Sequence, residues 1–283
     1  MIDRSKLKQL DKTSPYYPTE WKDVSFAPEV IEYVGNPALL TTRKLTVVGS
    51  RKTPVNGLQL GKKAVQTLAK HFTIVSGVAE GGDTVAVESA IEHGNVICVL
   101  AGGFSALPQS NLPLLRKVAK NGLLLSPYPF ETGVRGFSYS HRNKLLSALG
   151  EGTFVIGAGL KSGALNTAEY AIKANKKVFA FPYAPATTDG EGCNALIKKG
   201  AYLVENAEDI LQTFGLHTSV EEIVDLTADE KKMLCVLQEL GEGHIAVLAQ
   251  KSGLPVFKAS AIVSALTVKG KAVSVGGNRY MPV

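Results

Sequence analysis

The chain has 283 residues, of which 45% are hydrophobic and 20% are charged. This balance is typical of a folded globular protein and excludes an intrinsically disordered chain, and the length allows one large domain or a large and a small one. The formal net charge of +6 permits a polyanionic partner without requiring one. No run reaches the roughly 18 apolar residues of a membrane span. The charged N-terminus lacks the apolar core of a signal peptide, so we expect a cytoplasmic protein.

Residues 1–42 form a lead-in segment in which Pro15, Pro18, Pro28 and Pro37 interrupt any long element. The stretch 27–40 predicts a short strand or turn that leads into the main domain.

Residues 43–214 alternate short apolar runs with amphipathic stretches. The runs lack a two-residue alternation, which is typical of parallel strands covered on both faces. The predicted strands are 45–48, 73–75, 96–100, 123–125, 154–156, 178–181 and 202–204. Repeated strand–helix units predict a Rossmann-like, doubly wound, mostly parallel α/β sheet. A closed eight-stranded barrel fits less well, because the region is shorter than such barrels need.

The charge pattern changes abruptly after this region. Between Glu205 and Glu230 there are eight acidic residues and no Lys or Arg, whereas the segment from Lys251 to Val283 has five basic residues and no acidic one. Two adjacent runs of opposite sign indicate a domain boundary, which we place in a linker at 215–225.

Residues 226–283 predict three helices followed by a two-stranded hairpin. Thr227 and Glu230 have the spacing of a capping box, and Pro255 suits a helix start. Gly276 and Gly277 suit the turn of a hairpin. This order predicts a winged-helix domain whose third helix is the recognition element.

Small residues follow several of the predicted strands of the main domain. They are Gly49 and Ser50 (with Arg51) after the first strand, Ser76 and Gly77 after the second, Gly102 and Gly103 after the third, Ser126 after the fourth, and Ser162 (with Lys161) after the fifth. Ligands of doubly wound sheets bind at this edge, where glycines let backbone N–H groups approach an anion at a helix N-terminus. For a single loop of this kind, a tight strand-to-helix turn is the simpler interpretation. Several converging loops favour an anion-binding crevice.

The segment 135–144 combines basic and aromatic residues. Basic side chains neutralise phosphates, and an aromatic ring offers a face on which an unpaired base stacks. The alternative is that Phe137 and Tyr139 anchor the following helix in the core, which suits Phe137 better than Tyr139. His141 alone gives no evidence of catalysis.

Motifs for other ligands are absent. There is no GxGxxG, no GxxxxGK[ST] and no GxSxG in the sequence. Asp83 and Glu80 suit either a ribose hydroxyl or the start of the next helix, and for Asp83 a helix cap is the better interpretation. The isolated cysteines Cys98, Cys193 and Cys235 predict buried small side chains rather than a disulfide or zinc site. We therefore expect a protein without a cofactor, a metal or catalytic activity.

Six short motifs occur in an order that resembles the DprA/Smf family of DNA-processing proteins. They are GSR at 49–51, SGxAxGxD at 76–83, SxYP at 126–129, RNK at 142–144, KSGALNTAxxA at 161–171 and GxNxLIxxGA at 192–201. Glu80, Gly82 and Lys144 depart from the usual family pattern. The resemblance covers roughly residues 25–283.

The resemblance implies a homodimeric protein that binds single-stranded DNA, protects incoming DNA and loads the recombinase RecA during natural transformation and homologous recombination. It implies that Arg51, Arg142 and Lys144 contact phosphate, that Lys161 and Ser162 line the same groove and that Tyr139 stacks on a base. With the loop residues, the expected DNA-binding set is Gly49, Ser50, Arg51, Ser76, Gly77, Gly102, Gly103, Arg135, Tyr139, Arg142, Asn143, Lys144, Lys161 and Ser162.

Two other functions are compatible with the same predicted fold. A phosphoribohydrolase-like enzyme would use Glu169 on a ribose, although the paired glycines of that motif are missing. A nucleotide sensor would signal through the C-terminal domain. The winged helix itself suits either duplex DNA or a protein partner.

Overall fold

The computed structural model describes residues 4–22, 24–216 and 226–282. The chain divides into two compact units, residues 1–216 and 217–283. Most of the predicted linker, from residue 217 on, lies outside the described residues.

A nine-stranded sheet forms the centre of the first unit, in the order β1-β2-β6-β5-β4-β3-β7-β8-β9. The seven strands from β6 to β9 in this order run parallel, whereas β1 and β2 pair antiparallel to their neighbours. The strands are β1 (Lys8–Asp11), β2 (Val30–Gly35), β3 (Lys44–Gly49), β4 (Thr73–Ser76), β5 (Val96–Val99), β6 (Leu123–Ser126), β7 (Gly152–Gly157), β8 (Lys177–Ala180) and β9 (Tyr202–Leu203). The predicted mostly parallel α/β sheet is confirmed, and every predicted strand is present.

The lead-in segment contributes more than a connection, because it supplies both antiparallel strands. β2 pairs with β6, and β1 extends the sheet by one more strand. Trp21 is completely buried, and its Nε1 donates a hydrogen bond of 2.9 Å to the carbonyl oxygen of Leu145. Residues before the first predicted strand therefore belong to the core of the main unit.

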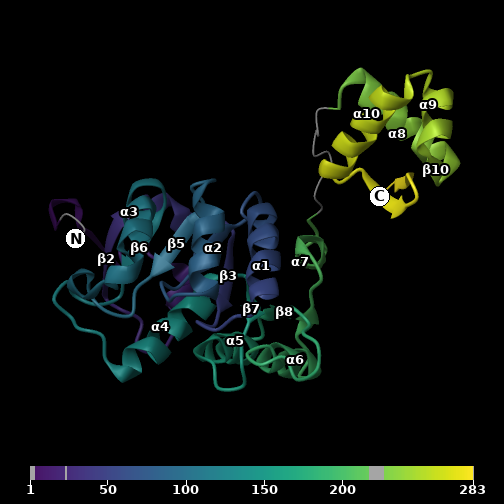
Figure 1. The fold of residues 1–283 in the computed structure, drawn as a ribbon. Helices are drawn as coiled ribbons and strands as arrows, with labels where there is room; N and C mark the ends of the chain where they lie inside the picture. Colours follow the sequence, from purple (N-terminus) through teal and green to yellow (C-terminus); the bar gives the residue numbers. More distant parts are fainter. Residues whose placement is uncertain (1–3, 23, 217–225, 283) are drawn as a thin grey trace. The chain divides into compact units, whose positions relative to one another are not determined.

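Helices cover both faces of the sheet (Figure 1). They are α1 (Val55–Leu68), α2 (Gly82–Ile91), α3 (Leu112–Asn121), α4 (Gly136–Leu149), α5 (Gly163–Lys173), α6 (Glu191–Lys198) and α7 (Ala207–Thr213). Short 3-10 turns lie at Arg4–Lys6, Thr19–Trp21, Pro37–Thr41, Phe104–Ala106 and Gln109–Asn111. α2 packs between α1 and α3 on one face, and α4 packs against α5 on the other. This double cover explains why β3 to β7 are buried along their whole length.

The strand order reverses between β3 and its neighbour β7. From β3 the chain continues into α1 on one face, whereas from β7 it continues into α5 on the other. The loops that leave these two strands consequently diverge, which opens a crevice at the carboxyl edge of the sheet.

The second unit has three helices and a small antiparallel sheet. Its elements are α8 (Ala228–Leu240), β10 (Gly243–His244), α9 (Ile245–Ser252), α10 (Val256–Val268), β11 (Ala272–Gly276) and β12 (Arg279–Pro282), with strand order β10-β12-β11. The predicted capping box is present, because Thr227 Oγ1 accepts from the Glu230 N–H and the Glu230 carboxylate accepts from the Thr227 N–H.

The prediction that all three cysteines are buried is wrong for one of them. Cys98 and Cys193 are buried in the first unit, whereas Cys235 is exposed on α8. Cys235 follows the buried Met233 by two positions, which turns it away from the apolar stripe of the helix. In the described parts of both units, no helix combines the length and apolar character required to cross a membrane.

Candidate nucleic-acid interface

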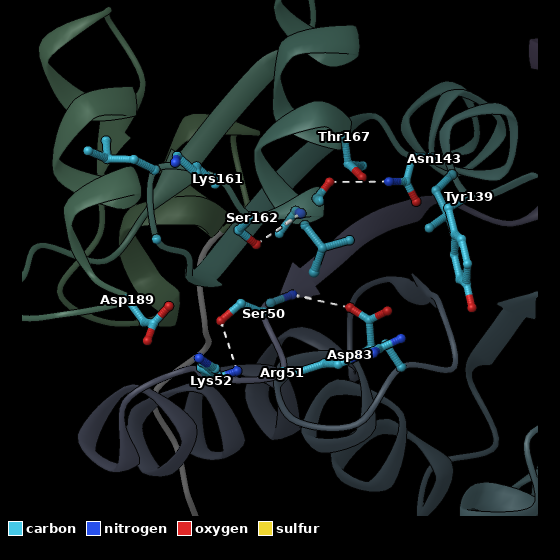
Figure 2. Close-up of a pocket in the computed structure, with 18 of the residues that line it drawn as sticks. Ser50, Arg51, Lys52, Asp83, Tyr139, Asn143, Lys161, Ser162, Thr167 and Asp189 are labelled. Carbon is cyan, nitrogen blue, oxygen red and sulfur yellow. Dashed lines mark hydrogen bonds between the residues drawn. The ribbon is translucent and has the colours of Figure 1, made fainter. Parts of the chain in front are cut away.

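A pocket of about 630 Å³ lies at the crevice between β3 and β7. Figure 2 shows how its walls are supplied by the loop after β3, the loop after β7 and the side of α4. Of the expected DNA-binding residues, this pocket brings together Gly49, Ser50, Arg51, Tyr139, Arg142, Asn143, Lys161 and Ser162.

A second pocket of about 240 Å³ adjoins the first. It is bordered by the segment after β5, including Gly102, and by residues 106–111. The two pockets share Arg51, Ala79, Tyr139 and Arg142. They therefore meet at these side chains and form one groove along the carboxyl edge of the sheet.

Cationic side chains surround the larger pocket. Arg51, Lys52 and Lys161 are exposed, and none of them has an ion-pair partner within the part of the chain that the structure describes. Ser162 caps α5, with its Oγ accepting from the Ala164 N–H at 3.2 Å. The remaining N–H groups of the first turn of α5, together with the helix dipole, favour an anion at this end.

Arg142 differs from these three cations because it is buried, with 5% of its surface exposed. Its Nη1 donates to the carbonyl oxygen of Val99 and its Nε donates to Asn143 Oδ1, both at 3.0 Å. Burial lowers the pKa of Arg142, while the negative charge of the nearby Asp83 opposes that shift. Arg142 thus presents a fixed positive charge at the base of the groove.

Asp83 is equally buried, and it does not cap α2 as the sequence suggested. Helix α2 begins at Gly82, so Asp83 lies inside its first turn and reaches across to the loop after β3. The Gly49 N–H donates to its Oδ1 at 3.2 Å. Burial raises the pKa of Asp83, whereas the charge of Arg142 lowers it. The carboxylate therefore holds the end of β3 through the Gly49 N–H and places a negative charge near Arg142.

Gly77 and Gly82 are required by close packing beneath the groove. A Cβ at Gly77 would collide with the Asp83 carboxylate and the Arg142 guanidinium, and a Cβ at Gly82 would collide with the backbone of Gly49. These glycines allow the two loops and the buried charges to approach one another. Gly77 was expected to contact DNA, but the structure places it under the charged pair.

Two further expected residues also have internal contacts instead of lining the groove. Ser76 is completely buried, and its Oγ donates to the Val47 carbonyl oxygen at 2.7 Å. Gly103 packs against the backbone of Pro129 and Phe130.

Asn143 connects the two helices that border the larger pocket. Its Nδ2 donates to the Gly163 carbonyl oxygen at 3.2 Å, at the start of α5. Because its Oδ1 accepts from Arg142, one amide side chain orients both the buried cation and the N-terminus of α5.

The aromatic residues at the start of α4 do not anchor the helix in the core. Tyr139 is 44% exposed and lies where the two pockets meet, and Phe137 is 65% exposed. The core-anchor interpretation is therefore wrong for both residues. Only Tyr139 offers its ring to the groove.

Arg135 and Lys144 are not among the residues that line either pocket. Arg135 is exposed just before α4, where its N–H donates to Ser138 Oγ at 3.2 Å. Lys144 Nζ donates to Ser25 Oγ at 3.3 Å and lies 5.5 Å from the centre of the Tyr170 ring. For Lys144 the cause is helical geometry, since it lies two positions beyond Arg142 on a different face of α4.

His141 has a structural position on that outer face. Its Nδ1 lies 2.8 Å from the Tyr128 hydroxyl and its Nε2 lies 2.9 Å from the Phe26 carbonyl oxygen. The ring therefore bridges the lead-in segment and the loop after β6.

Sequence reasoning missed the acidic wall of the larger pocket. Asp189 lines it from the connection between β8 and α6, and Glu191 lines it as the first residue of α6. Figure 2 shows Asp189 on the same side of the pocket as Lys52. The rule that ligands bind beyond the carboxyl ends of parallel strands also applies to β8, and it would have directed attention to this connection.

The glutamate that a phosphoribohydrolase-like enzyme would use does not lie at the groove. Glu169 is exposed on α5 and lines neither pocket. Within the described ranges, no group of three or more His, Cys, Asp or Glu side chains is arranged to hold a metal ion.

The sequence model of the DNA recombination-mediator protein A family matches residues 8–215. DNA processing protein DprA of Streptococcus pneumoniae is 35% identical over 201 residues, which cover 70% of this chain and 71% of the relative. Protein Smf of Escherichia coli is 34% identical over 210 residues, covering 72% of this chain, and this chain spans only 56% of it.

Two solved structures are similar to this chain over nearly three quarters of its length. The S. pneumoniae DNA processing protein A has a TM-score of 0.70 at 32% identity, over 73% of this chain and 74% of that one. A structure that describes the single-stranded DNA binding mode of the Helicobacter pylori protein has a TM-score of 0.68 at 29% identity, over 74% of this chain and 95% of that one. The chain belongs to the DNA recombination-mediator protein A family.

Proposed function

We propose that the joined pockets bind single-stranded DNA, with phosphates at the loops after β3 and β7 and a base against Tyr139. This proposal rests mainly on what borders the groove. Three cations that have no ion-pair partner in the described chain lie along it, together with the start of α5 and one exposed aromatic ring. Cations neutralise phosphates, and a ring stacks on a base of any sequence when the strand is unpaired. The binding mode described for the H. pylori protein supports the same class of ligand here.

In the cell, this protein would protect incoming DNA and load RecA during natural transformation and homologous recombination, acting as a homodimer and without chemistry on the strand. Family membership supports this role. A recombinase-loading assay tests it: the protein is expected to accelerate RecA filament formation on single strands covered by a single-strand binding protein. Unchanged filament formation would contradict the loading role while leaving DNA binding intact.

The domain assignments form part of the same proposal. Residues 43–214 are the Rossmann-like DNA-binding domain, with 1–42 as its lead-in and 215–225 as a linker. Residues 226–283 are a winged helix, which the order of three helices and an antiparallel hairpin supports.

Replacing the aromatic ring of the groove tests the proposed ligand. Tyr139→Ala is expected to weaken binding to an unpaired oligonucleotide by about 5- to 150-fold, the range that corresponds to roughly 1–3 kcal/mol for one stacked base. Phe137→Ala is the matched control, because it removes an exposed ring of the same helix that lies outside both pockets. Fluorescence anisotropy with single-stranded and duplex oligonucleotides measures both. Equal losses in the two variants, or a preference for duplex, would contradict the proposal.

A further inference from the structure

The exposed side of α10, the third helix of the second unit, has an apolar stripe. Phe257 is 79% exposed and Val268 is 90% exposed, at opposite ends of the helix. Ala261 and Ser264 lie between them and are also exposed. Spacings of four, three and four residues place all four on one side of the helix over about 16 Å. Large exposed apolar side chains arranged on one face indicate an interaction surface.

The cations of this helix are already neutralised. Lys258 Nζ lies 2.6 Å from an Asp229 carboxylate oxygen, and Lys269 Nζ lies 2.8 Å from both carboxylate oxygens of Glu230. Both carboxylates belong to the first turn of α8. In the hairpin, Arg279 forms an ion pair with Glu242. Three of the four cations between the start of α10 and the end of the hairpin are therefore paired, and Lys271 is the one without an ion pair among the described residues, which leaves the third helix little positive charge to neutralise phosphates.

The stripe is symmetric about its own midpoint. The midpoint between Phe257 and Val268 is also the midpoint between Ala261 and Ser264. If a second α10 packs antiparallel about a two-fold axis at that point, each large residue lies opposite the other large residue, and each small residue lies opposite the other small one. Small residues at the crossing allow the two helices to approach closely. A surface that matches itself in this way meets the requirement for an interface in a two-fold dimer.

We propose that the C-terminal unit associates with the C-terminal unit of a second copy of this chain, through antiparallel contact of the two α10 stripes. Two observations point to a second copy as the partner. The stripe carries no charge, so an equally uncharged stripe can pack against it. The order of large and small residues along the stripe is the same when it is read in the opposite direction, so two copies match in an antiparallel arrangement. This contact is separate from the DNA groove and does not depend on the proposed DNA binding.

A disulfide cross-link reports the contact directly in the full-length protein. Ala261→Cys is introduced together with Cys235→Ser, which removes the exposed native thiol, while Cys98 and Cys193 are buried. Mild oxidation is expected to link two chains at position 261, near the two-fold axis. Val247→Cys in the same background is the control for random collision, because Val247 is exposed on a different helix, α9.

Charge substitutions then test the antiparallel register. Phe257→Lys alone places an unpaired charge against Val268 of the other chain at each end of the contact and is expected to reduce the cross-linked fraction at least severalfold, and Val268→Glu alone is expected to do the same against Phe257. The two substitutions together are expected to restore it, because opposite charges then face each other across the axis.

Three results would overturn the proposal: a cross-link no faster than that of the Val247→Cys control, equal cross-linking in all four charge versions, or a double variant no better than the single ones. Loss of the cross-link on addition of a duplex oligonucleotide would assign the stripe to DNA instead. An interface formed only by the first units would give cross-linking that is independent of positions 257 and 268.

Discussion

The two units of this chain each contain a cluster of basic residues, but the clusters differ in what the cations contact. At the groove of the first unit, Arg51, Lys52 and Lys161 have no carboxylate partner among the described residues. In the second unit, Lys258, Lys269 and Arg279 all form ion pairs within their own unit. The sequence shows both clusters as positive charge. The structure shows that these three cations of the second unit have carboxylate partners, whereas those of the first unit are unpaired among the described residues.

The two units also differ in how their surroundings shift the pKa values of charged side chains. Under the groove, burial raises the pKa of Asp83 and lowers that of Arg142. In the second unit, hydrogen bonds from Lys269 and Thr227 lower the pKa of Glu230. One unit holds a pair whose charges are costly to bury, and the other holds a carboxylate that is favoured in its charged form.

The largest predicted effect is the loss of stability when the buried Arg142 side chain loses its charge. Arg142→Met removes the positive charge near the buried Asp83 and the hydrogen bonds to the Val99 carbonyl oxygen and to Asn143, and is expected to lower the free energy of unfolding by about 3–5 kcal/mol. Lys258→Met, which breaks the exposed pair with Asp229, is expected to cost about 1 kcal/mol or less. Denaturant unfolding of both variants measures the difference. Equal losses would contradict the contrast between the two clusters.

Acid is expected to affect the two carboxylates in opposite directions. Because the pKa of Glu230 is lowered from its ordinary value of 4.5, its stabilisation is present above that pH and is lost as pH falls through the lowered value. Asp83 has a raised pKa, so its protonated form favours the folded state, and stability falls as pH rises above its ordinary value of 3.8. Thermal unfolding of the protein and of Glu230→Gln between pH 3 and 7 tests the first statement. A loss on acidification that is as steep in Glu230→Gln as in the unchanged chain would contradict it.

The acidic wall of the groove is expected to oppose DNA. Asp189→Asn removes a carboxylate that faces the basic loops and is expected to tighten single-strand binding roughly threefold, in the range of exposed charge interactions. Glu169→Gln makes the same kind of change outside the pockets and is expected to have no effect. Weaker binding by Asp189→Asn would show instead that the carboxylate contacts the ligand.

The smallest expected change is at the second unit. Lys258→Ala and Arg279→Ala are each expected to leave single-strand affinity and its salt dependence unchanged, because both cations already have carboxylate partners. A clear loss of affinity in either variant, measured by anisotropy at several salt concentrations, would show that the second unit contributes to DNA binding.

The sequence predicted the parallel strands well, because short apolar runs without alternation are typical of strands that helices cover on both faces. It predicted a short strand or turn at 27–40, where β2 lies, but it did not predict β1 or the antiparallel pairing, since prolines obscured the short pattern and pairing with β6 is a long-range contact. It placed Arg51, Lys161 and Ser162 at one edge, because that edge follows from topology, whereas Tyr139 was proposed from the composition of 135–144 and from the family resemblance. It could not show that Arg142 is buried at the groove while Lys144 lies outside it. Burial and the direction in which each helix face points depend on packing rather than on residue type.

The most direct test of the central claim is the salt dependence of single-strand binding in two variants with the same change of charge. Arg51→Ala removes a cation from the groove, and Arg135→Ala removes one from the surface before α4. If Arg51 contacts a phosphate, its loss lowers the slope of log K against log salt by about 0.7, whereas the slope of Arg135→Ala remains that of the unchanged protein. Equal slopes in both variants would contradict the assignment of the DNA-binding site to this groove.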